Sequence, residues 1–201
     1  MNRSAFTTIE IIVASTIIAI LSIGVLSLQY LLTTNQLTTI NSYLNVDQTN
    51  ASIASLIREL REARNSDAGA HPLVTLEDNQ IIFYSDIDYD GDVERVRYTL
   101  TSQTLEKGVI NPTGFPITYP VESERVFIIT EHITNISDPL FTYFNQDWPE
   151  DTINNPLPEV NRLSDTRLIR VLINLNTNPN YQKQEYVLES FVNLRSLKRN
   201  L

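Results

Sequence analysis

The hydrophobic positions are concentrated in one uninterrupted run near the start of the chain. Eighteen residues without a charge extend from Ile11 to Leu28, and the next charged residue is Asp47. At a rise of about 1.5 Å per residue, this run forms a helix of about 27 Å, close to the roughly 30 Å hydrocarbon core of a bilayer. A small domain has no interior for a helix of this length that is apolar on all sides. The pattern therefore predicts a membrane-length helix over 11–28.

Beyond Leu28 the helical pattern continues and becomes amphipathic. The apolar residues that recur at helical spacing are Ile40, Tyr43 and Leu44, and then Ile53, Leu56, Ile57 and Leu60. Good helix formers continue to Arg64, and Gly69 and Pro72 are typical of the residues that follow a helix end. We therefore expect one helix over 6–65, whose second half is buried against a folded domain.

From residue 72 onward the pattern changes to short β-branched and aromatic runs separated by turns. These runs predict strands over 80–87, 93–103, 104–110, 124–133, 140–144, 166–176 and 184–197. Prolines mark an irregular connection over 112–120 and a surface loop over 145–161. We therefore expect an α+β chain, in which the long N-terminal helix packs on a small antiparallel β-sheet domain over 72–201, the head.

The composition excludes several classes of function. The chain has 24 acidic and 15 basic residues and a net charge of −9, so we expect no nucleic-acid binding, which needs clustered Lys and Arg. It has no cysteine, which excludes disulfides, thiolate nucleophiles and Cys-based zinc sites. His71 and His132 lie at no spacing that suggests a metal pair or a general base, and no G-x-S-x-G motif is present. We expect a non-enzymatic protein that needs no cofactor.

A single acidic residue precedes the apolar run. The leader MNRSA has one Arg and a small last residue, and it is followed by Phe6 and Glu10. A carboxylate inside a bilayer costs about 2.5–3.5 kcal/mol on insertion scales, so Glu10 is expected to face a cation or the membrane interface. Alternatively, Glu10 is a carboxylate at a helix N-terminus, where the helix dipole stabilises it by about 0.3–1 kcal/mol.

The segment AFTTIEIIVASTIIAIL resembles the class III prepilin signal of type IV pilins, type II secretion pseudopilins and competence pseudopilins. The resemblance implies that prepilin peptidase cuts between Ala5 and Phe6, removes the leader over 1–5, and N-methylates Phe6. It also implies that Glu10 contacts the N-terminal amine of a neighbouring subunit during assembly. Ala5 departs from the glycine that the family usually has before the cut.

The order of elements in the head is similar to that of W-type minor pilins and J-type minor pseudopilins. The similarity rests on the hairpin with D-x-D-x-D-G, on LFTYF, and on the closing pair TRLIRVLINL and YVLESFVNLRSL. It implies a structural minor subunit at or near the tip of a type IV pilus-like filament. A major pilin and a pseudopilin of another position remain open, and the machine is a twitching pilus, a type II secretion system or a DNA-uptake system.

The same resemblance implies partners and a location. The partners are other pilin or pseudopilin subunits, prepilin peptidase and the inner-membrane assembly platform. The subunit is expected in the bacterial inner membrane, with its head outside the cytoplasm, and then in the filament. One alternative is a pilus-borne adhesin that binds a ligand through the 111–125 or 145–161 loops, and another is a simple membrane-anchored domain.

The segment DIDYDGDVE contains one candidate metal site. Its acidic residues are Asp86, Asp88, Asp90, Asp92 and Glu94. Alternating acids before a Gly resemble the start of a calcium loop, because Ca²⁺ prefers several oxygen ligands around a tight turn. An EF-hand needs a Glu at its twelfth position, which is Arg97 here, so the segment is not an EF-hand. The favoured interpretation is a solvated Asp-Gly hairpin turn, and a Ca²⁺ site is the alternative.

Overall fold

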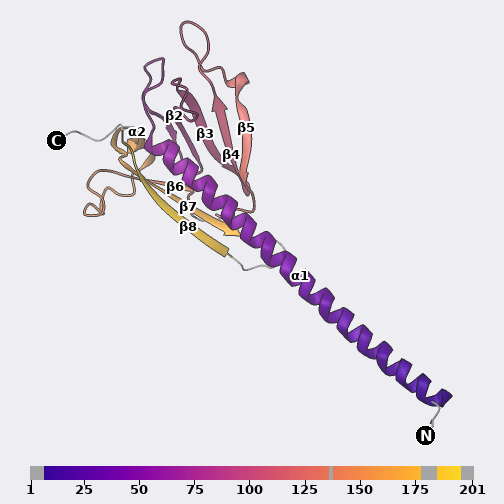
Figure 1. Cartoon of the computed structure of the whole chain (residues 1–201). Coiled ribbons are helices and arrows are strands. Elements are labelled where there is room, and N and C mark those ends of the chain that lie inside the picture. Colours follow the sequence, from indigo (N-terminus) through magenta and orange to yellow (C-terminus); the bar gives the residue numbers. More distant parts are fainter. Residues whose placement is uncertain (1–6, 136–137, 178–184, 196–201) are drawn as a thin grey trace. The chain divides into compact units, whose positions relative to one another are not determined.

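The computed structural model describes residues 7–135, 138–177 and 185–195 (Figure 1). The chain divides into two compact units, Met1–Tyr43 and Leu44–Leu201. The division falls inside the long helix α1, Thr8–Arg61, rather than at its end. The last part of α1 therefore belongs to the same unit as the strands.

In the first unit α1 is long and apolar enough to cross a membrane. The candidate span is Thr8–Gln36, 29 residues, and none of its side chains is buried within the structure. Exposed fractions of 63% at Leu21 and 65% at Ile23 are typical of the segment. The candidate span thus extends beyond the predicted range 11–28 at both ends.

One face of α1 is buried from Ile53 onward, as the spacing predicted, whereas Ile40, Tyr43 and Leu44 of the predicted stripe are 54–70% exposed. Ile53, Leu56 and Leu60 are at most 2% exposed and belong to the hydrophobic core. The helix ends at Arg61, earlier than predicted, because the Arg64 N–H donates to the Tyr84 carbonyl oxygen (3.0 Å). This hydrogen bond directs the chain away from the helix axis and towards the first sheet.

The first sheet is antiparallel and has the strand order β1-β2-β3-β4-β5. Its strands are β1 (Leu73–Leu76), β2 (Gln80–Ser85), β3 (Glu94–Thr101), β4 (Thr104–Ile110) and β5 (Arg125–Thr130). Buried and half-buried positions alternate over most of β3, as expected for a sheet with one face on the core. β1 was not predicted, because four residues directly after a proline carry too little periodicity.

The second sheet is also antiparallel, with the order β6-β7-β8. Its strands are β6 (Phe141–Phe144), β7 (Leu168–Asn176) and β8 (Glu185–Asn193). Short helical turns lie outside the sheets: η1 (Val121–Ser123), η2 (Glu159–Asn161) and α2 (Arg162–Asp165). The expected single sheet is therefore two sheets.

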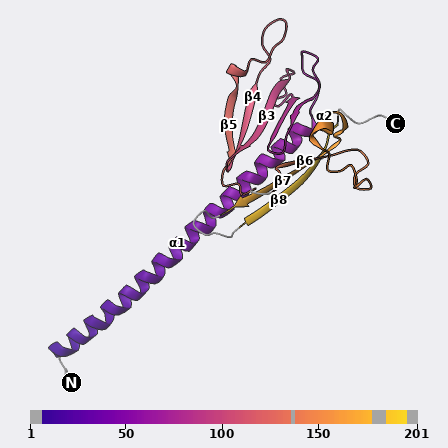
Figure 2. The same cartoon turned by 180° about the vertical axis from the view of Figure 1, so that it is seen from behind.

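The last turns of α1 share one core with both sheets. In Figures 1 and 2, this part of the helix runs between the β1–β5 sheet and the β6–β8 sheet. The core joins residues of α1 to Phe83, Val96 and Tyr98 of the first sheet and to Phe141, Ile169 and Val171 of the second. The strands and the amphipathic half of α1 confirm the predicted α+β layout.

Candidate functional site

Ala5 and Phe6, the predicted processing residues, lie outside the described residues, whereas Glu10 is described. Glu10 lies in the first turn of α1, where its Oε2 accepts hydrogen bonds from the Thr7 N–H (2.8 Å) and the Thr7 hydroxyl (2.9 Å). The Glu10 N–H in turn donates to the Thr7 Oγ1 (3.4 Å). This reciprocal arrangement is a capping box, which satisfies two donors at the helix start. Glu10 is therefore a carboxylate at a helix N-terminus, as the alternative interpretation expected, and its side chain is exposed.

Polar side chains of the apolar segment are satisfied within the helix. The hydroxyls of Thr16, Ser22 and Ser27 each donate to the carbonyl oxygen four residues earlier, at 2.8 Å. With such internal hydrogen bonds these three hydroxyls do not require water. The segment is consequently suited to a bilayer or to contact with other apolar helices.

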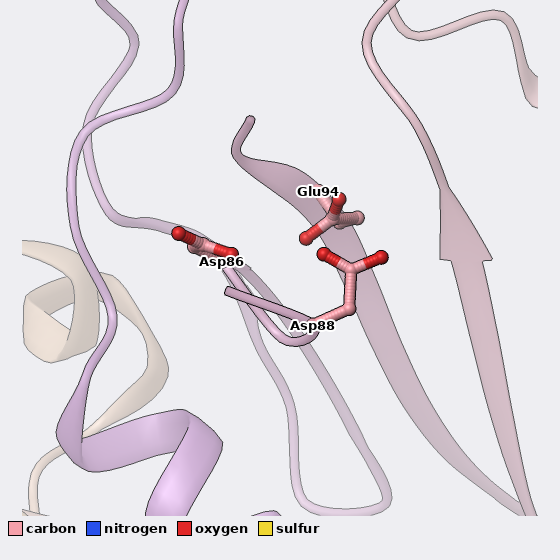
Figure 3. Close-up of side chains that lie close together, drawn as sticks. All are labelled: Asp86, Asp88 and Glu94. Atoms are coloured by element: carbon pink, nitrogen blue, oxygen red, sulfur yellow. The ribbon is translucent and has the colours of Figure 1, made fainter. Parts of the chain in front are cut away.

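Three of the five acidic residues predicted as a metal site lie together at the neck of the β2–β3 hairpin. One carboxylate oxygen each of Asp86, Asp88 and Glu94 lies within 4.8 Å of the others (Figure 3). Asp86 follows the last residue of β2, and Glu94 begins β3 in register with Ser85. The loop between the strands returns through positive φ angles at Tyr89 and Gly91.

The cluster contains buried carboxylate oxygens with no partner. Glu94 is 1% exposed, and its Oε2 accepts the Ile87 N–H (3.0 Å), but its Oε1 has no hydrogen bond within the described structure. The Oδ2 of Asp86 pairs with the Arg64 guanidinium (2.8 Å), and its buried Oδ1 is likewise unpartnered there. Burial raises the pKa of the Glu94 carboxyl, the hydrogen bond from Ile87 opposes this, and the charge of Asp88 adds to the increase.

Asp90 and Asp92 are not part of this group. The Oδ1 of Asp90 accepts the Asp92 N–H (2.9 Å), which is an Asx-turn hydrogen bond within the exposed tip of the loop. The predicted hairpin is present, but its loop spans residues 86–93 and is longer than a two-residue turn. The positive φ angle before Gly91 belongs to Tyr89 and not to Asp90.

Sequence reasoning missed the residues that hold this loop from outside. Arg64 donates to the Gly91 carbonyl oxygen (3.3 Å) as well as to Asp86, and the Asp67 carboxylate accepts the Val93 N–H (2.8 Å). These contacts join positions 22 to 27 residues apart, so no local pattern predicted them. The loop is therefore fastened to the segment that follows α1.

A second missed group is buried between α1 and the first sheet. Glu59 is 4% exposed and accepts hydrogen bonds from the Lys107 ammonium (2.6 Å) and the Tyr98 hydroxyl (2.8 Å). Burial, followed by the charge of Glu59, raises the pKa of Tyr98 far above its ordinary value, so its hydroxyl stays a donor. The signal in the sequence was an acidic residue on the apolar face of the helix.

Trp148, in the 145–161 loop considered for ligand binding, is partly covered. The Trp148 ring lies 4.6 Å from that of Phe144, centroid to centroid, and is half-buried. In the same loop, the Asn155 side chain donates to the Asn145 Oδ1 and to the Asp151 carbonyl oxygen, both at 2.8 Å. The loop over 145–161 is therefore internally hydrogen-bonded around a packed tryptophan.

A scan against models of known protein families and a search of curated proteins both found no match to this chain.

Proposed function

We propose that the chain is a structural subunit of a type IV pilus-like filament, a minor pilin or minor pseudopilin. The observation that carries the proposal is the use of one helix for two purposes. Up to Gln36 the helix α1 exposes an apolar surface on all sides, and from Thr49 onward it provides one side of the core of an antiparallel β-rich unit. A subunit that anchors in the inner membrane and then packs its helix among other helices requires both features.

Glu10 supports this proposal through its accessibility. Its carboxylate is bonded only locally, to Thr7, within the described structure. Processing between Ala5 and Phe6 would create a methylated amine at the N-terminus of a neighbouring subunit. Opposite charges attract more strongly in a medium of low dielectric than in water, so this amine would pair with Glu10 as the helices pack.

The head also offers a surface suited to neighbouring subunits. β5 is an edge strand, and Val126, Phe127 and Ile128 on it are about half exposed or more, at 49–63%. An apolar edge strand of a solitary protein is an aggregation hazard, whereas in an assembly it is available for contact. Other pilin or pseudopilin subunits are the partners that the proposal requires.

The proposal is tested by recovery of the chain in sheared filaments from cells that contain the full assembly machinery. We expect Glu10→Ala to be processed and retained in the inner membrane but depleted at least tenfold from filaments. The matched control is Glu150→Ala, which removes an exposed acid from the head and should leave recovery unchanged. Equal recovery of Glu10→Ala and the control would contradict the assembly role of Glu10, and absence of even the wild-type chain from filaments would instead support a simple membrane-anchored domain. The adhesin alternative would be supported if cells that lack this chain still made filaments in normal amount, and those filaments had lost only their adhesion to cells or surfaces.

A further inference from the structure

The neck of the β2–β3 hairpin holds carboxylates that the hairpin itself does not explain. The Asx turn of Asp90 and the positive φ angle of Gly91 account for the tip of the loop without a metal. They leave the Glu94 Oε1 and the Asp86 Oδ1 buried and without a hydrogen-bond donor in the described part of the chain. Buried polar atoms are almost always satisfied, so two such oxygens in one group of carboxylates point to a missing partner.

We propose that Asp86, Asp88 and Glu94 bind one calcium ion at this neck. The side chain of Glu94, which is 1% exposed, points into the group between the two aspartates (Figure 3). The proposal concerns the head alone and does not depend on the filament function.

The spacing of the carboxylates fits a calcium ion. Ca²⁺–oxygen distances of about 2.3–2.6 Å place two ligands on opposite sides of the ion about 4.6–5.2 Å apart. The three ligand oxygens here lie within 4.8 Å of one another. An ion between them would lie at most about 2.8 Å from each oxygen, so a small inward movement of the side chains brings all three to the Ca²⁺ distance. The ligands are all carboxylate oxygens. Hard cations such as Ca²⁺ prefer oxygen ligands, whereas many transition metals prefer imidazole or thiolate.

The charges also fit a divalent cation. Three carboxylates carry three negative charges, and the Arg64 guanidinium compensates one of them through the Asp86 Oδ2. The remaining two charges match those of Ca²⁺. Asp90 and Asp92 lie outside the ligand group in the same loop and strengthen the local negative field.

The arrangement favours Ca²⁺ over Mg²⁺, and it indicates a modest affinity for Ca²⁺. Asp88 is exposed, and Glu94 Oε2 and Asp86 Oδ2 are already engaged, so water must complete the coordination. Ca²⁺ accepts such irregular, partly hydrated ligand sets, whereas Mg²⁺ requires near-octahedral geometry. We expect a dissociation constant of about 10⁻⁴–10⁻³ M, in the range of extracellular calcium modules.

A bound ion would close the loop at the point where it meets the end of α1. It would join Asp86, at the end of β2, to Glu94, at the start of β3, while Arg64 holds Asp86 from the other side. The ion stabilises the folded state by mass action because an unfolded chain does not hold these residues together. The head is therefore expected to be more stable in a calcium-containing exterior than in chelator.

The test uses the full chain, purified in detergent and freed of metal. Calorimetric titration with CaCl₂ should show one ion per chain, and thermal unfolding should shift upward by several degrees at about 10 mM Ca²⁺, roughly tenfold above the expected dissociation constant. Equal concentrations of Mg²⁺ should give a smaller shift. Asp88→Asn and Glu94→Gln should each weaken calcium binding at least tenfold, and the control Asp92→Asn, which removes a nearby charge but no ligand, should weaken it by a much smaller factor.

The variants separate binding from misfolding. Asp88 is exposed, so Asp88→Asn leaves the core intact even if Glu94→Gln disturbs the neck. The absence of both heat and stabilisation at about 10 mM Ca²⁺ in the wild type would overturn the proposal and leave a metal-free hairpin turn. Undiminished binding by Asp88→Asn, or an equal loss in Asp92→Asn, would also overturn it, because the ion would then bind elsewhere or respond only to net charge.

Discussion

At the scale of single residues, Gly108 makes room for an ion pair across the first sheet. Arg97 on β3 donates from Nε and Nη2 to the two carboxylate oxygens of Glu124, at 2.8 and 2.9 Å. Gly108 on β4 is the register partner of Arg97, and a Cβ built on it would overlap the Glu124 carboxylate. A glycine within a strand normally weakens it, so here the space it leaves for this bidentate pair is the compensation.

We therefore expect Gly108→Ala to lower the free energy of unfolding by about 1 kcal/mol, because the added methyl displaces Glu124 from Arg97. Urea unfolding of the detergent-solubilised full chain measures the change. In a Glu124→Ala background, the same substitution should be neutral or slightly stabilising, since alanine restricts the unfolded chain more than glycine does. An equal loss in both backgrounds would mean that the methyl meets something other than this carboxylate.

The same pair predicts a dependence of stability on pH. The hydrogen bond from Arg97 lowers the pKa of Glu124 below its ordinary value of 4.5. A carboxyl whose pKa is lower in the folded state contributes stability above the unfolded pKa and loses it as the pH falls through the folded pKa. The wild type should therefore exceed Glu124→Gln in unfolding free energy at pH 7, and the difference should shrink below about pH 4.5. A difference that stays constant down to pH 3 would contradict this role.

At the scale of elements, α1 is fastened to the first sheet by charge as well as by apolar contact. Glu59 lies among the buried residues of the helix and is paired with Lys107 of β4, which is 14% exposed. Removal of one partner from a buried pair leaves an uncompensated charge, which costs more than the pair itself contributes.

Lys107→Met should accordingly destabilise the head by about 3 kcal/mol. The double variant Glu59→Gln with Lys107→Met should recover most of this loss, because the glutamine still accepts the Tyr98 hydroxyl without a charge. Denaturant unfolding of both variants gives the comparison. If the double variant is as unstable as the sum of its single substitutions, the two side chains act independently.

The elements were predictable to the extent that their patterns are local. The buried face at Ile53, Leu56 and Leu60 and the alternation along β7 both appear within a few turns or residues. The end of α1 was not predictable, because it depends on a hydrogen bond from Arg64 to Tyr84, which lies twenty residues away. The division into two sheets likewise depends on which strands pair, and periodicity carries no information about pairing.

The candidate site shows the same limit. Asp86, Asp88 and Glu94 fall within nine residues, so their alternation made them visible in the sequence. The exclusion of Asp90 and Asp92 follows from loop geometry, since the Asp90 side chain turns back to the loop's own N–H groups. Arg64 was missed because it is 22 residues from Asp86 along the chain and contacts it only in the folded structure.

At the scale of the whole molecule, the two units have different requirements. The unit Leu44–Leu201 buries its own core, whereas the apolar segment Thr8–Gln36 leaves its surface uncovered. Such an apolar surface is covered by a bilayer, by other helices, or first by one and then by the other. The proposed filament subunit uses both, the first before assembly and the second after it.

The most direct test of this account is the intact mass and N-terminal sequence of the membrane-extracted chain, produced with and without its prepilin peptidase. A filament subunit should begin at N-methylated Phe6 only when the peptidase is present, and should keep its full length when the peptidase is absent. A chain that retains Met1–Ala5 in the presence of an active peptidase would contradict the account and leave a helical membrane anchor.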